Sequence, residues 1–247
     1  MKKFPLLPAI TAVVAAAYFL VPLFATFYFS LKMTRGTLSF AAYESVFSSR
    51  EFLDSLAFST LASLAAIVMG ALIIVPTVYW VRLKIPRLRP VVEFVSLLPL
   101  IVPGVVLVFG YIRLFGSNSY LPMTNSDHGT NLLLVFAYVI MSMPYMYRAV
   151  DNGMAAIDIS TLTEAAASLG ASRLRTIALV IFPNVRASII AGSFLTFSIS
   201  LGEFVIPSLL NRPAFGPWAC MALMQAFANK KPGQAILPFL SRKEIRP

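Results

Sequence analysis

The chain has 247 residues, of which 58% are hydrophobic and 12% are charged, whereas an ordinary soluble domain has roughly 25% charged residues. A compact soluble protein cannot hide so much apolar surface, because its exterior must carry most of its polar groups. The net charge of +10 is compatible with a nucleic-acid surface or with a membrane face. The basic residues lie between apolar segments and not along an amphipathic face interleaved with exposed aromatics, which argues against nucleic acid.

Long uncharged runs divide the chain into membrane-sized segments, such as the 28 residues between Lys3 and Lys32. A bilayer core about 30 Å thick needs about 20 apolar residues of helix. The fold class is therefore all-α, a polytopic membrane helix bundle, expected to form one domain over 1–247. The expected spans are 8–31, 55–81, 91–114, 131–150 and 186–210.

The first segment follows Met1-Lys2-Lys3 and thus also has the start of a secretory signal peptide. Its apolar run is nearly twice the length of a typical signal region, which predicts an uncleaved anchor. The third span carries Pro99 and Pro103, and the fourth carries Pro144. Each proline removes a helix hydrogen bond and predicts a kink. The kinks either reflect the ordinary tolerance of membrane helices for proline or mark broken helices that line a pathway.

Orientation follows from the basic residues in the short connections. With a cytoplasmic N-terminus, ten basic residues fall inside, five fall outside, and the five in the tail are left unassigned. The inner set is Lys2, Lys3, Arg82, Lys84, Arg87, Arg89, Arg148, Arg173, Arg175 and Arg186, and the outer set is Lys32, Arg35, Arg50, Arg113 and Arg212. The ratio predicts that the N-terminus and the loop 151–183 are cytoplasmic.

Two short helices are expected in the loop 151–183. Thr161 and Glu164 fit a capping box, with Thr161 as the N-cap. Gly170 suits the left-handed conformation that ends a helix, and Ser172 can cap a second helix that runs to Pro183. The first helix has a narrow apolar stripe of Leu162, Ala165, Ala166 and Leu169. This stripe either docks into a groove of another protein or packs under the chain's own spans.

The loop resembles the EAA loop of permease subunits from binding-protein-dependent ABC importers. Glu164, Ala165, Ala166, Gly170 and Pro183 match that pattern in type and spacing, while Val-Ile-Phe-Pro at its end departs conservatively from Ile-x-Leu-Pro. The stretch Leu-Gly-Glu-Phe-Val-Ile at 201–206 is similar to the branch that handles spermidine, putrescine and similar solutes.

The resemblance implies a bacterial inner-membrane permease that works by alternating access and has no enzymatic activity of its own. A separate cytoplasmic ATPase dimer would bind ATP and Mg²⁺, because the chain lacks the glycine-lysine sequence of a phosphate-binding loop. Its other partners would be membrane lipid, a second permease subunit, identical or related, and an extracytoplasmic solute-binding protein. The residues implied to couple transport to the ATPase are Glu164, Ala165, Ala166, Leu169, Gly170 and Pro183.

A polar stripe on the fifth expected span is the predicted pathway lining. Ser193, Thr196, Ser200 and Glu203 are spaced three, four and three residues apart and so share one helical face. Glu203 either meets a cationic solute or is a solvated charge near the end of the helix. The hydroxyl residues either line the pathway or form helix contacts.

The tail 211–247 makes a poor sixth span, because 213–229 contains prolines, glycine and amides and is followed by Lys230-Lys231. A truncated gene or an atypical last helix would account for this, and the tail is expected to pack poorly.

A secondary transporter or channel and an inactive membrane remnant remain as alternative functions. One cysteine and one histidine exclude an intramolecular disulfide, a thiolate cluster and a two-histidine zinc site.

Overall fold

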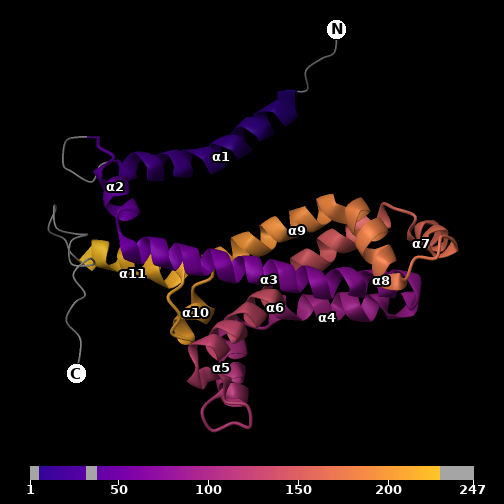
Figure 1. Cartoon of the computed structure of the whole chain (residues 1–247). Helices are drawn as coiled ribbons and strands as arrows, with labels where there is room; N and C mark the ends of the chain where they lie inside the picture. Colours follow the sequence, from indigo (N-terminus) through magenta and orange to yellow (C-terminus); the bar gives the residue numbers. More distant parts are fainter. Residues whose placement is uncertain (1–5, 32–37, 229–247) are drawn as a thin grey trace. The chain divides into compact units, whose positions relative to one another are not determined.

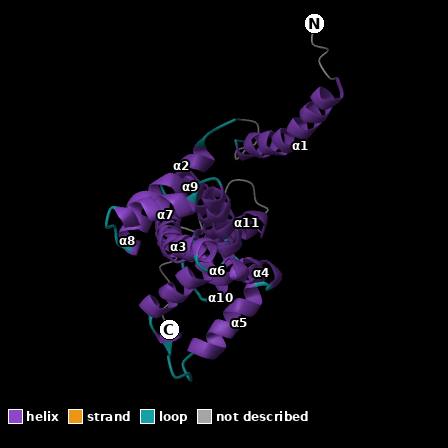
Figure 2. Ribbon diagram, turned by 90° about the vertical axis from the view of Figure 1, so that its right-hand side faces the viewer, coloured by secondary structure: helices purple, strands orange, loops and turns teal. Residues whose placement is uncertain are grey.

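The computed structural model describes residues 6–31 and 38–228 (Figure 1). The contacts divide the chain into two compact units, residues 1–53 with 221–247 and residues 54–220. Within the described ranges every regular element is a helix (Figure 2). The all-α fold class is therefore confirmed, and the expectation of one domain over 1–247 stays a prediction.

The first unit contains the first membrane helix, α1 (Leu6–Ser30), which matches the span expected over 8–31. No side chain in its window Ala9–Tyr28 is buried by the protein. An apolar helix with no buried side chain requires lipid, another protein or another part of this chain around it. The short helix α2 (Ala41–Phe47) is joined to the end of α1 by a hydrogen bond of 2.6 Å between the hydroxyls of Ser30 and Tyr43.

The second unit contains most of the bundle and the loop that the sequence singles out. Its long helices are α3, α6 and α9. Helix α3 begins in the first unit, and α11 ends in it. The elements are α3 (Arg50–Leu83), η1 (Pro86–Leu88), α4 (Arg89–Ile101), α5 (Gly104–Phe115), η2 (Met123–Asn125), α6 (Asp127–Ala155), α7 (Ile159–Ser168), α8 (Arg173–Thr176), the π-helix η3 (Ile177–Ile181), α9 (Phe182–Gly202), α10 (Val205–Leu209) and α11 (Phe215–Ala228).

Four described helices are long and apolar enough to cross a membrane: α1, α3, α6 and the continuous helix Arg173–Gly202. The last three have 34, 29 and 30 residues, so at 1.5 Å per residue each exceeds the hydrocarbon core of about 30 Å. The predicted polytopic helix bundle is confirmed. The doubtful sixth span of the tail contains α11, which has 14 residues, and residues 229–247 lie outside the described part of the chain.

The third expected span, 91–114, is not one kinked helix. It consists of α4 and α5, which meet at an angle of 97°. The break lies at Val102, whose backbone is extended (φ −85°, ψ 115°) before Pro103, because the proline ring disfavours the helical conformation of the residue that precedes it. Pro99 and Pro144 remain inside α4 and α6 without ending them. The broken-helix alternative therefore applies to Pro103.

The fifth expected span, 186–210, begins earlier and ends earlier than predicted. A continuous helix runs from Arg173 to Gly202, and Glu203 then adopts an extended conformation before α10. Pro183 does not stop the second loop helix, because the π-turn η3 precedes it and redistributes the backbone hydrogen bonds that the proline disrupts. The side-chain amide of Asn184 donates to the Val180 carbonyl at 2.7 Å.

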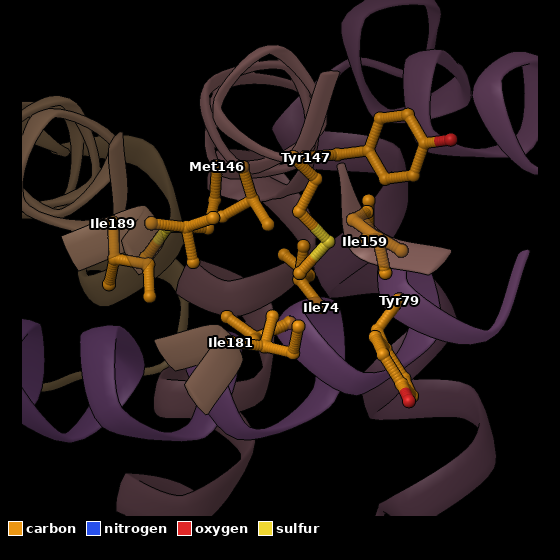
Figure 3. Close-up of a cluster of buried hydrophobic side chains, with 12 residues drawn as sticks. Ile74, Tyr79, Met146, Tyr147, Ile159, Ile181 and Ile189 are labelled. Atoms are coloured by element: carbon orange, nitrogen blue, oxygen red, sulfur yellow. The ribbon is translucent and has the colours of Figure 1, made fainter. Parts of the chain in front are cut away.

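Two buried apolar clusters hold the second unit together. The α7-end core joins α3, α6, α7, η3 and α9 (Figure 3). Its members are Ile74, Val75, Val78, Tyr79, Met146, Tyr147, Val150, Met154, Ile159, Ile181, Val185 and Ile189. The α10-end core joins α3, α5, α6 and α10 and consists of Ala62, Ala66, Val108, Leu134, Val135, Ala137, Tyr138, Val139, Ile206 and Leu210.

The close packing of α6 on α9 depends on a small residue at Gly192. A β-carbon there would lie 2.6 Å from the sulfur of Met146 and 3.3 Å from its α-carbon. Gly192→Ala should therefore lower the free energy of unfolding by about 1–3 kcal/mol. Gly110→Ala is the matched control, because a β-carbon at Gly110 meets nothing within 4 Å. The check is thermal unfolding of both variants in detergent, and equal midpoints would contradict the packing argument.

Candidate functional site

Helix α7 begins three residues earlier than the sequence predicts, because its N-cap is Asp158 and not Thr161. The carboxylate of Asp158 accepts hydrogen bonds from the Thr161 amide at 3.2 Å and from the hydroxyls of Thr161 and Ser160, both at 2.7 Å. These bonds, first that from the Thr161 hydroxyl, lower the pKa of Asp158 to about 2. Aspartate is itself a preferred N-cap, so the correct cap was visible in the sequence.

The end of α7 agrees with the prediction for Gly170. Its φ is +76°, which is the left-handed region that glycine enters without steric cost. Its amide donates to the Ala167 carbonyl at 2.9 Å, and the Ala171 amide donates to the Ala166 carbonyl at 3.0 Å. This pair of bonds is a Schellman motif. Ser172 caps the next helix as predicted, because its hydroxyl accepts from the Arg175 amide.

The apolar stripe predicted on α7 is divided between two faces. Ile159 and Ala166 are buried and Leu162 is half-buried, so this side of the helix rests on the α7-end core. Ala165 and Leu169 are exposed on the other side. The change follows from the earlier helix start, which brings Ile159 into register with Leu162 and Ala166. Helix α7 thus packs on its own unit and still presents a free face.

The free face combines polar and apolar side chains around the Gly170 turn. Glu164 is exposed, and Leu169 and Leu174 have 88% and 81% of their surface exposed. A shallow cavity of about 210 Å³ lies next to them and is lined by Ala166, Leu169, Ala171, Arg175, Leu179 and Val180. Sequence reasoning missed the exposed Leu174 and Leu179, of which Leu179 lines this cavity together with Leu169.

A buried carboxylate lies at the end of α6, near the start of α7, and sequence reasoning also missed it. Asp151 receives hydrogen bonds from Arg82 of α3 at 2.5 Å and from Arg89 of α4 at 2.9 Å. A further ion pair of 3.1 Å joins Arg148 of α6 to Glu93 of α4, and this pair is more exposed. The sequence signal was an acid at the end of a span that is flanked by basic connections.

The predicted pathway residues lie toward the opposite end of α9. Thr196 and Ser200 are buried, Ser193 is half-buried, and the hydroxyls of Ser193 and Thr196 donate to carbonyls one turn earlier in α9. Glu203 follows the last residue of α9 and is half-buried. Its carboxylate accepts from the amides of Val205 and Ile206 at 2.9 and 3.2 Å, which satisfies the first turn of α10.

The ion pairs of Asp151 with Arg82 and Arg89 are expected to stabilise the folded protein. Asp151→Asn should lower the free energy of unfolding by about 3–5 kcal/mol, because it leaves the largely buried guanidinium of Arg82 without a counter-charge. Glu93→Gln is the matched control and should cost less than about 1 kcal/mol, since its partner is exposed. Thermal unfolding in detergent measures both, and similar costs would contradict the assigned role of Asp151.

Several curated permeases are similar to parts of the chain. A probable molybdenum ABC transporter permease of Haloferax volcanii is 31% identical over 61% of this chain and 55% of its own length. The putrescine transport system permease PotI of Escherichia coli K12 is 27% identical over 72% of this chain and 60% of its own length. The molybdenum transport system permease ModB of the same strain is 31% identical over 47% of this chain and 53% of its own length. The chain thus spans a little over half the length of these relatives.

The family comparison covers the region that contains the site. The profile of the binding-protein-dependent transport system inner membrane component matches residues 86–225, which run from η1 into α11 and include α7, the Gly170 turn and Glu203. This segment is more than half of the 247 residues. The chain therefore belongs to the family of inner membrane components of binding-protein-dependent transport systems.

Proposed function

We propose that the chain is the membrane-spanning permease subunit of an ATP-binding cassette importer. The observation that carries the proposal is the α7–Gly170–α8 segment, which rests on the bundle by one face and leaves Glu164, Ala165 and Leu169 exposed. Supporting this role, the profile match includes the whole segment. The relatives are named ABC transporter or transport system permeases.

The free face of α7 is proposed to dock into a cleft of a cytoplasmic ATPase dimer, which supplies ATP, Mg²⁺ and the hydrolytic chemistry. Glu164 pairs or hydrogen-bonds at the interface, Ala165 permits close approach, and Leu169 supplies apolar area. Gly170 provides the turn, and Ala166 acts from the buried side by holding α7 against the α7-end core. Pro183 marks the point at which the loop helix continues into the span.

Movement of the ATPase would reach the membrane through two routes. Ile159 and Leu162 link α7 to buried side chains of α3 and α6. Helix α8 continues through η3 into α9, so the loop and the span form one helix of 30 residues. A partner that closes on α7 and α8 would therefore tilt α9, which is the rigid-body displacement that alternating access requires.

The pathway is proposed to pass the α9 end beside the half-buried Ser193 and Glu203, while the buried Thr196 and Ser200 form helix contacts behind it. The half-buried carboxylate of Glu203 favours a small polar cation, and a putrescine permease is among the relatives. The solute class is therefore proposed to be polyamine-like. A second permease subunit completes the pathway, and an extracytoplasmic binding protein delivers the solute.

The proposed orientation places the N-terminus and α7 in the cytoplasm of a bacterial inner membrane. It is supported by the basic residues that gather where α3 and α6 end and α4 begins, which follows the distribution of lysine and arginine in membrane proteins. Arg82, Lys84, Arg87, Arg89 and Arg148 belong to this group.

Coupling through α7 is tested by co-purification with the ATPase. Leu169→Glu and Gly170→Val should each weaken ATPase binding by about 30-fold, because an interface anchor is worth about 2 kcal/mol or more. Leu121→Glu is the matched control, since Leu121 is also exposed but lies in the α5–α6 loop at the other end. The measurement is the amount of ATPase retained on the tagged permease, and full retention in both variants would overturn the docking proposal.

Transport itself is tested in vesicles that contain the permease subunits, the ATPase and the binding protein. Uptake of labelled putrescine should require ATP and binding protein, and Glu203→Gln should reduce it because the counter-charge for a cation is lost. Uptake without ATP would instead indicate a secondary transporter or channel. ATP-dependent uptake of molybdate in place of putrescine would contradict the proposed solute class but not the importer.

A further inference from the structure

A cavity of about 450 Å³ lies where the end of α3 meets α7 and α8. One wall comes from α3 and the residue after it, and the other comes from the loop helices. The lining residues are Tyr79, Trp80, Leu83, Lys84, Thr163, Ala167, Ala171, Arg173, and Thr176. A hydrogen bond of 3.2 Å between the hydroxyls of Tyr79 and Thr163 joins the two walls.

The charge of this cavity is entirely positive. Lys84 lines it from the α3 side and Arg173 from the α8 side, and none of the lining residues is acidic. Both cations are exposed, while their elements are fixed by the buried Tyr79 and Thr176. Two cations and neighbouring hydroxyl groups on opposite walls suit an anion with several oxygen acceptors, such as a phosphate ester.

The α3 wall continues along an exposed face of this apolar helix. Ile73, Thr77, Trp80 and Lys84 are spaced four, three and four residues apart and follow one face of α3. Ile73 and Trp80 are each 48% exposed, on a helix long and apolar enough to span the membrane. Tryptophan followed by lysine at the end of a span is typical of the membrane–water interface.

We propose that this cavity binds the headgroup of an anionic phospholipid. Lys84 and Arg173 contact the phosphate, and Trp80 and Leu83 contact the glycerol and the upper acyl chain. A bound lipid would bridge α3 to α7 and α8, so its headgroup would stabilise the position of the loop helices. The α7 residues of this site, Thr163 and Ala167, differ from Glu164, Ala165 and Leu169 of the free face, although Ala171 lines both cavities.

Tryptophan fluorescence can report on this site directly, because the chain has two tryptophans. Trp218→Phe leaves Trp80 as the single tryptophan of the full-length chain. The protein is reconstituted into vesicles with brominated phosphatidylglycerol or brominated phosphatidylcholine, whose bromine atoms quench nearby tryptophan. Quenching should show preferential binding of phosphatidylglycerol, and Lys84→Gln and Arg173→Gln should each reduce this preference about five-fold, the equivalent of about 1 kcal/mol per cation.

Arg87→Gln is the matched control, because Arg87 is an exposed basic residue of the same connection but does not line the cavity. It should leave the lipid preference unchanged. Equal quenching by the two lipids, or equal loss in all three charge variants, would overturn the proposal.

Inorganic phosphate, compared with chloride at the same ionic strength, should not remove the preference for phosphatidylglycerol. Loss of the preference in phosphate would assign the cavity to a free phosphate. Native mass spectrometry of the unaltered sequence should show retained phosphatidylglycerol, whereas its absence would contradict the site.

Discussion

The buried carboxylate of Asp151 is the interaction on which the α7 end of the bundle depends. It accepts hydrogen bonds from α3 and α4, and α6 ends at Ala155, four residues after it. Three helices are thereby fixed at their ends, and α7 starts at Ile159, shortly after the end of α6. The α7-end core continues this arrangement inward with Val78, Tyr147 and Val150. The position of α7 is thus set by one charge cluster and by the apolar side chains behind it.

Most of the spans could be predicted from the uncharged runs, because a long apolar segment in lipid must satisfy its backbone hydrogen bonds internally, as a helix does. Where the prediction failed, local backbone chemistry was decisive. Val102 is extended before Pro103 and turns the third span by 97°. Pro183 stays inside a helix because a π-turn precedes it. Proline alone does not tell a sequence reader which of these two outcomes occurs.

The candidate site shows the same division between local and distant information. Gly170 and Ser172 act on residues within one turn, so their roles could be predicted from sequence spacing. Asp158 and Thr161 are both acceptable caps, and burial of Ile159 accompanies the earlier helix start. Asp151 could not be placed, because its partners lie 69 and 62 residues away in the sequence. The exposed face of α7 likewise emerged only when the buried face was known.

The continuity of α8 with α9 has a mechanical consequence. A helix of 30 residues is about 45 Å long. When a helix of this length pivots near the loop end by about 5°, its other end moves by about 4 Å, which is more than the roughly 2.8 Å diameter of a water molecule. For a given tilt, the displacement of the far end therefore depends on the length of the helix. A tilt that moves Ile181 only slightly would therefore displace the Glu203 end, where the solute pathway is proposed to pass, several times further.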